Sequence, residues 1–188
     1  MPSMTRRTRD LSATRASILE AARELFTAHG YGGVGVREIA ERAGADKALI
    51  VRYFGSKEGL FLEAVQEVLD VSPLLGKDRK DFGRTAAASI IAGCSGSVSP
   101  MMALLRSLGD PVAAQHLRDR LESGVVEPLA AWLGGKNAQA RATRFVSYMF
   151  GFWISAGMMP LGYFRGASGE KLAAEMAPIL QSVIDEDD

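Results

Sequence analysis

One short stretch of the sequence carries the side chains best suited to reading a nucleic acid. Helical spacing through residues 46–54 leaves four of them facing outward: Lys47, Ala48, Val51 and Arg52. A narrow helix with such a surface suits the major groove of DNA, because Lys and Arg donate to guanine edges and small apolar groups meet thymine methyls. The chemistry indicated is recognition of a base sequence.

Two predicted helices, 36–43 and 46–54, position these side chains. Ala40 is small enough to let the second helix approach the first, and Gly44 can take the left-handed conformation of a tight turn. Apolar residues are expected to seal the core between the helices: Ile39, Ala43, Ala45, Ile50 and Tyr53. The spacing is that of a helix-turn-helix, but a purely structural helical hairpin has the same spacing, so this pattern alone leaves both open.

The helix before this pair is expected to run from Ser12, as its N-cap, to His29, where Gly30 suits a C-terminal cap. Its apolar residues recur at spacings of three and four: Ile18, Leu19, Ala22, Leu25 and Phe26. Four arginines precede or open it: Arg6, Arg7, Arg9 and Arg15. A basic arm of this kind, over residues 1–11, can reach phosphates or a minor groove, although a solvated tail has the same composition.

A boundary between two domains is predicted where the fourth helix ends. That helix carries the apolar residues Leu60, Phe61, Ala64, Val65 and Val68. Ser72-Pro73 interrupts the pattern, so we assign 1–71 to a helix-turn-helix domain and 72–188 to a larger helical domain. Strand signals are scarce throughout, which predicts an all-α protein.

Five or six helices are predicted in the larger domain, each bounded by Gly or Pro. Their ranges are about 79–94, 100–108, 111–133, 137–159 and 170–185. Pro128 and Pro178 fall inside two of these ranges and are expected to kink or divide the helices.

The segment 145–164 contains no charged residue, so a membrane span has to be considered. Pro160 and Gly162 break its end and leave about 15 helical residues, or about 22 Å, against a hydrocarbon core of about 30 Å. We therefore expect no membrane span but a helix that protein buries on all sides.

The composition narrows the functional class. Residues 1–60 carry ten Lys or Arg against seven Asp or Glu, while the rest of the chain carries twelve against fifteen, so positive charge gathers near the N-terminus. Cys94 is the single cysteine, which excludes an intrachain disulfide and fits the cytoplasm, as does the lack of a signal-peptide pattern. His29 and His116 have no partner at metal-ligand spacing, and no catalytic motif is complete. We expect neither a metal nor a cofactor, and no enzymatic activity.

Three parts of this chain resemble the DNA-binding domain of tetracycline-repressor (TetR) type regulators. They are the run VREIAERAG at 36–44, Lys47, and the run RYFGSKE at 52–58 with Leu60 after it. The resemblance covers roughly residues 14–65, and the rest matches only as a helical domain of suitable length. It implies a homodimeric repressor that binds pseudo-palindromic, double-stranded operator DNA and is released by a small-molecule effector.

The same resemblance implies roles for individual residues. Lys47, Ala48 and Arg52 would face bases, Tyr53 and Lys57 would contact phosphates, and Arg37 would approach the backbone of the DNA. The chain departs from the family at Gly35, where Thr or Ser is usual, at Leu49, where a hydroxyl-bearing or small residue is usual, and at Val51, where a phosphate-contacting tyrosine is usual. Either these two apolar side chains meet thymine methyls, or affinity depends more on Arg52, Lys57 and the arm.

Large adaptable side chains in the second domain suggest an effector pocket for an apolar ligand. The candidates are Met101, Phe145, Tyr148, Met149, Phe152 and Met159. Five of these are expected to share one face of the charge-free helix, while Ser147, Gly151 and Ile154 lie opposite. The last two long helices are expected to form most of the dimer. Ser147, Gly151 and Ser155 form a stripe of small residues that would let a second helix approach closely, from the same subunit or from its partner. The alternatives are a helical enzyme or cofactor-binding protein with a structural hairpin, and a DNA-architectural protein without a ligand.

Overall fold

The computed structural model of the protein describes residues 4–76, 78–94 and 97–186. Over these ranges all regular structure is helical and no strand occurs, which confirms the all-α prediction. Most helix boundaries agree with the predicted ranges to within three residues.

The chain divides into two compact units that are each made of two chain segments. Unit 1 comprises Met1–Glu67 and Gly96–Leu117, and unit 2 comprises Val68–Ser95 and Arg118–Asp188. This division by packing differs from the division by function between residues 71 and 72, which stays a prediction. One helix, α8 (Pro111–Leu121), contributes residues to both units.

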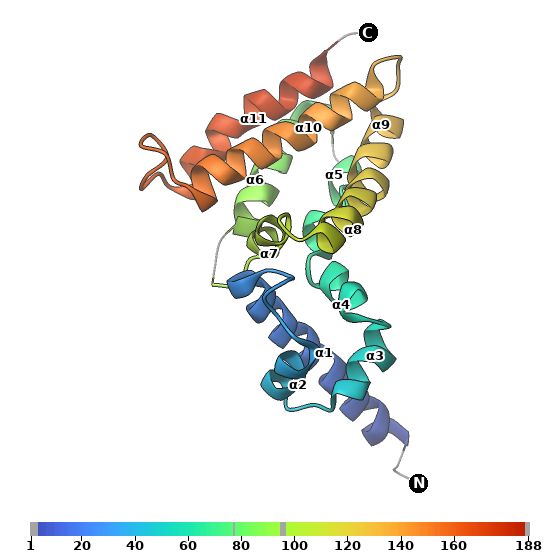
Figure 1. The fold of residues 1–188 in the computed structure, drawn as a ribbon. Helices are drawn as coiled ribbons and strands as arrows, with labels where there is room; N and C mark the ends of the chain where they lie inside the picture. Colours follow the sequence, from blue (N-terminus) through green and yellow to red (C-terminus); the bar gives the residue numbers. More distant parts are fainter. Residues whose placement is uncertain (1–3, 77, 95–96, 187–188) are drawn as a thin grey trace. The chain divides into compact units, whose positions relative to one another are not determined.

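Unit 1 is built around its first helix. The helices that lie wholly within it are α1 (Met4–His29), α2 (Val36–Ala43), α3 (Lys47–Phe54), α4 (Lys57–Ala64) and α7 (Pro100–Ser107). In Figure 1, α2 and α3 lie beside the long α1, and each of α2, α3, α4 and α7 contacts it. Fully buried side chains from several of these helices form the core: Ile18, Ala22, Phe26, Ile39, Ile50, Leu60 and Phe61.

The turn between α2 and α3 takes the predicted form. Gly44 has φ of 62° and ψ of 34°, and the backbone N–H of Ala45 donates to the Ala40 carbonyl at 2.9 Å. The Asp46 carboxylate caps α3 by accepting from the Ala48 backbone N–H at 2.7 Å. Because both ends of the turn are fixed by local hydrogen bonds, the sequence of this short segment is enough to set its geometry.

Two predicted boundaries in unit 1 are wrong. α1 begins at Met4, so Ser12 lies inside the helix and is not its N-cap. No Gly or Pro stands between residues 4 and 29, and arginine is a good helix former, so nothing stops the helix on its N-terminal side. The fourth helix ends at Ala64, and a 3₁₀ turn, η1 (Gln66–Val68), carries the remainder of its apolar pattern.

Unit 2 contains the remaining helices. They are α5 (Ser72–Leu75), which was not predicted, the 3₁₀ turn η2 (Arg79–Asp81), α6 (Phe82–Cys94), the π turn η3 (Glu122–Val126), α9 (Glu127–Leu133), α10 (Ala138–Trp153), the π turn η4 (Ile154–Met158) and α11 (Gly169–Asp185). α6 packs along α11, and α10 packs against both α9 and α11.

Pro128 sits at the start of α9 and is accommodated by a change of helix type. A proline has no N–H to donate to the carbonyl four residues earlier, which here belongs to Gly124. The π turn η3 contains Gly124, and its carbonyl accepts instead from the backbone N–H of Val71 at 3.1 Å. Pro178, in contrast, lies within α11 without dividing it.

The charge-free helix is only partly buried within the single chain, so its burial on all sides stays a prediction that a partner copy would have to complete. Phe145, Met149 and Trp153 are buried, but Tyr148 and Ile154 are 42% and 39% exposed. No element among the described residues covers the exposed face. Within the described ranges no helix combines the length and the apolar character that crossing a membrane requires.

Arg141 ties the end of α11 to α10 in unit 2. Its guanidinium is only 4% exposed and donates to the carbonyls of Val183, at 2.9 Å, and Ile184, at 2.8 Å. The last carbonyls of a helix have no partner within it and carry its negative partial charge, so a buried cation there is favourable. One turn on, Arg144 pairs with Glu186, and both of these side chains are more than two-fifths exposed.

We expect Arg141→Leu to lower the free energy of unfolding by about 2 to 3 kcal/mol, because two charge-assisted hydrogen bonds to buried carbonyls are lost. The matched control is Arg144→Leu, which removes an exposed ion pair and should cost less than about 1 kcal/mol. Urea unfolding of both variants at one protein concentration measures the difference. Equal losses of unfolding free energy would show that the Arg141 hydrogen bonds to the end of α11 stabilise the fold no more than an exposed ion pair does.

Candidate nucleic-acid interface

The outward face of α3 is as the sequence predicts. Lys47, Ala48, Val51 and Arg52 are all exposed, and Val51 is 59% exposed. Leu49 is half-buried. On the opposite face Ile50 is fully buried, so the helix is held by its core side chain while its outer side chains remain accessible. A short helix of this kind can enter a major groove without rearrangement.

Arg37 lies on the same side of unit 1 as the start of α3. It is exposed on α2 and lines a shallow hollow together with Lys47. The hollow is completed by Ala40, Glu41, Ala45 and Asp46. The structure therefore brings together two of the predicted DNA contacts, one for the backbone and one for bases.

The Gly35 departure from the family pattern is partly compensated. Gly35 precedes α2 in extended conformation and has no side chain to cap the helix, but its backbone N–H donates to the Glu38 carboxylate at 3.4 Å. This is one half of a capping box, supplied from within the helix.

Tyr53 is placed differently from the other predicted contacts. Its ring is half-buried, and its Oη atom is enclosed without a hydrogen-bond partner among the described residues. A buried hydroxyl without a partner is costly, so an acceptor that reaches it would be favoured. A phosphate contact from Tyr53 requires the hydroxyl to be uncovered first.

Lys57 opens α4 and lies over an aromatic ring. Its Nζ atom is 4.0 Å from the ring centroid of Tyr31, a cation–π arrangement. The Ser56 hydroxyl caps the same helix by accepting from the backbone N–H of Gly59 at 3.1 Å. The predicted phosphate contact thus stands at a helix N-terminus, where partial positive charge attracts anions.

Glu58, the next residue, is held by the same tyrosine. The Tyr31 hydroxyl donates to Glu58 Oε1 at 2.6 Å, and this bond, followed by a bond from the Ser56 side chain, lowers the pKa of Glu58 to about 2. Burial, and then the hydrogen bond to Glu58, raise the pKa of Tyr31 well above its ordinary value. Glu58 is therefore a carboxylate at neutral pH.

Sequence reasoning assigned no role to Tyr31 or to Glu58, although Glu58 ends the run that resembles the family. Tyr31 lies 27 positions from Glu58 and 76 from Ser107, whose Oγ accepts from the Tyr31 backbone N–H at 2.8 Å. A periodic pattern in the sequence reports only on neighbours three or four residues apart, so it carries no signal for contacts of this range.

Arg15 does not behave as part of a free basic arm. It pairs with Glu63 at 2.6 Å, and its guanidinium lies 4.8 Å from the ring centroid of Phe54. Residues 4–10 continue α1, and the side chains of Arg6, Arg7 and Arg9 lie outside the description. The arm over 1–11 stays a prediction.

The candidate pocket residues differ in burial, and five of the six lie in unit 2. Met101 is buried in α7 of unit 1, while Phe145 and Met149 are buried in unit 2 and Met159 is 59% exposed. Tyr148 and Phe152 line an open groove between α10 and α11 instead, with a volume of about 250 Å³.

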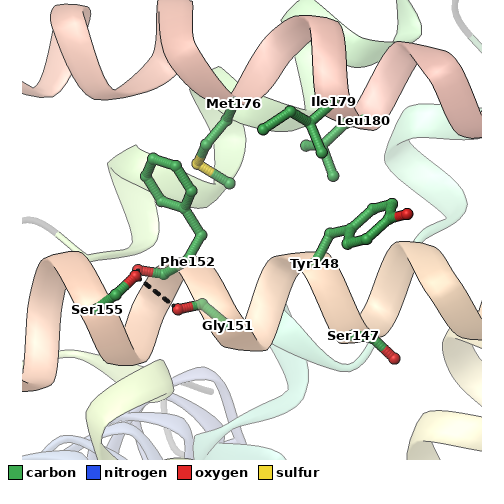
Figure 2. A pocket seen from close by; sticks show the side chains of 8 residues that line it. All are labelled: Ser147, Tyr148, Gly151, Phe152, Ser155, Met176, Ile179 and Leu180. Carbon is green, nitrogen blue, oxygen red and sulfur yellow. Dashed lines mark hydrogen bonds between the residues drawn. The ribbon is translucent and has the colours of Figure 1, made fainter.

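Figure 2 shows this groove, with Phe152 pointing from α10 toward Met176 of α11. Ser147, Gly151 and Ser155 line it too, so Tyr148 shares its face with these small residues and not with Phe145. The expectation of two separate faces was wrong here. Tyr148 lies about 60° from both Phe145 and Gly151 around the helix, so it stands where the two faces meet, and its side chain is on the open one.

Comparison with known proteins assigns both parts of the chain. Residues 18–64 match the family model described as bacterial regulatory proteins, tetR family. Residues 80–184, more than half of the chain, match the tetracyclin repressor-like C-terminal domain.

Relatives and solved structures agree with these matches. The HTH-type transcriptional regulator RutR of Escherichia coli K12 is 38% identical over 84 residues, which are 44% of this chain and 39% of RutR. The transcriptional repressor AcnR of Corynebacterium diphtheriae is 43% identical over 58 residues, 31% of this chain and 30% of AcnR. A TetR-family regulator from Rhodococcus sp. has the same fold, with a TM-score of 0.68 at 18% identity over 92% of this chain and 99% of its own. The chain thus aligns with well under half the length of the curated relatives.

Proposed function

Because the chain belongs to the TetR family of bacterial regulatory proteins, we propose that it is a transcriptional repressor. In this proposal it binds pseudo-palindromic operator DNA as a homodimer in the cytoplasm and releases the DNA when a small effector binds. The observation that carries the proposal is the outer face of α3, where Lys47, Ala48, Val51 and Arg52 are exposed on a helix anchored by buried Ile50. The relatives are regulators by name, which favours this function over that of a helical enzyme or cofactor-binding protein.

Arg52 and Lys57 are proposed to contribute to DNA binding in different ways. Arg52→Ala should weaken operator binding by about 1 to 3 kcal/mol and relax the base preference, because a bidentate contact to guanine is lost. Lys57→Ala should weaken operator and scrambled DNA alike and reduce the salt dependence by about one phosphate contact. Gel shifts with the DNA upstream of the chain's own reading frame, and with a scrambled duplex, at several salt concentrations measure both effects. A Lys57→Ala variant with an unchanged salt slope would remove the phosphate assignment.

The groove between α10 and α11 is proposed as part of the dimer interface. Two copies are needed because recognition helices enter successive major grooves about 34 Å apart. The exposed apolar side chains of Tyr148 and Ile179 and the small residues beside them would let a partner helix pack closely.

Gly151 offers a clean test of this interface. A Cβ atom added there meets nothing within 4 Å in the single chain, so Gly151→Leu should fold normally. If a partner copy covers the groove, the variant should lose dimerisation in analytical ultracentrifugation at micromolar concentration. The control is Gly157→Leu, which also has open space but does not line the groove. An unchanged dimer for Gly151→Leu would place the interface elsewhere.

An uncharged, largely apolar effector is proposed to bind within unit 2. The buried face of α10 that carries Phe145, Met149 and Trp153 supports this best, since the Trp153 Nε1 atom is enclosed without a hydrogen-bond partner among the described residues. A ligand with one acceptor would satisfy that donor.

Effector and operator should then weaken each other by the same factor, typically about 5- to 150-fold, because coupling between two binding sites is reciprocal. Titrating an uncharged fluorescent probe such as Nile red with and without operator duplex measures this coupling. Equal affinities in the two titrations would remove the proposed coupling between effector and operator.

A further inference from the structure

Tyr31 lies between two neighbouring residues of opposite charge. The Lys57 ammonium is 4.0 Å from the centroid of its ring, and the Glu58 carboxylate accepts from its hydroxyl at 2.6 Å. Lysine and glutamate are consecutive in the first turn of α4, yet one tyrosine holds the cation against its face and the anion at its edge. The Lys57 ammonium therefore lies over the ring of Tyr31, while the Glu58 carboxylate lies at its hydroxyl.

This separation matters because of what the end of α4 is proposed to bind. A phosphate group there is attracted by the first backbone amides and by the Lys57 ammonium. The Glu58 carboxylate competes for the same amides and repels the phosphate if its side chain is free to turn outward. Its hydrogen bonds from Tyr31 and Ser56 fix where that negative charge stands.

Tyr31 is itself held firmly. Its side chain is 6% exposed, and its ring packs on Phe26 and Phe61 with centroid distances of 6.3 and 5.3 Å. Its backbone N–H donates to Ser107 Oγ at 2.8 Å. With two packing contacts on the ring and a hydrogen bond from the backbone, the Tyr31 hydroxyl has a fixed place, so Glu58 is fixed as well.

We propose that Tyr31 is a positioning residue for phosphate binding: it retains the Glu58 carboxylate so that the Lys57 ammonium alone faces the DNA backbone. The inference rests on the proposed function, since it concerns how the same surface binds DNA. Tyr31 itself need not touch the DNA.

The first variant is Tyr31→Phe, which keeps the ring and its packing and removes only the hydroxyl. Released Glu58 remains ionised at pH 7, so affinity for a mixed-sequence DNA duplex at low salt should fall about three- to tenfold, as expected for one like charge brought near a phosphate in a high-dielectric setting. Glu58→Gln alone should bind at least as tightly as the wild type, because the amide can still accept from Tyr31 and carries no charge.

The decisive variant is the double substitution Tyr31→Phe with Glu58→Gln. It should restore affinity to within about twofold of Glu58→Gln, because the charge that Tyr31 controls is gone. If Tyr31 mattered only for stability, the double variant would bind no better than Tyr31→Phe. Circular dichroism melts of all three variants establish that the folded state is being compared.

The outcomes separate this inference from the proposed function. If the wild type binds neither upstream nor mixed-sequence DNA, the proposed function fails. If the wild type binds DNA while Tyr31→Phe binds equally well, or remains weak after Glu58→Gln is added, the positioning role is overturned. Affinity that is lost in Tyr31→Phe and regained in the double variant supports it.

Discussion

Unit 1 depends on the junction that Tyr31 makes at the end of α1. Its backbone N–H donates to Ser107 of α7, and its ring packs on Phe26 and Phe61. Its hydroxyl and the face of its ring contact the first turn of α4. Two further polar contacts between α1 and α7 lie close by, since Thr27 Oγ1 exchanges hydrogen bonds with the backbone of Ser99 and Arg106 donates to the Ala28 carbonyl. The geometry of the proposed DNA surface follows from this packing, because α2 and α3 are mounted on α1 and α4 is fixed at its N-terminus.

Local sequence was sufficient wherever local forces decide the structure. The turn at Gly44, the cap at Asp46 and the outward face of α3 could be predicted, because each is set by residues within one or two helical turns. The start of α1 was missed because Ser12 is a good cap only where a helix has a reason to begin, and nothing before it ends the helix. The Tyr31 contacts and the Gly124 bond to Val71 join distant segments, so no periodic pattern reports them.

A sequence pattern also could not predict which part of the α10 surface is exposed in unit 2. Periodicity identified α10 correctly and predicted that protein buries its surface on all sides, without separating its own chain from a partner. The structure shows two different faces, one buried with Phe145 and Met149 and one open with Tyr148 and Gly151. A sequence that is apolar on both faces cannot say whether the second face is covered by its own chain or by another, because the hydrophobic effect is non-directional and counts only the area removed from water.

The place of α7 bears on how regulators of this kind could be recombined. In sequence it follows the second unit's first segment, yet it supplies the partners of Thr27, Ala28 and Tyr31 in the first. A fragment cut after residue 71 would leave the end of α1 without those hydrogen bonds and with apolar surface bared. A chimera that joins unit 1 to the effector-binding domain of another regulator therefore has to include α7. Otherwise it needs another helix that offers the same hydroxyl and guanidinium groups. Unit 1 is made of two separate chain segments, so a gene fusion cannot transfer it as one continuous piece. This restricts which effector-binding domains can be joined to it.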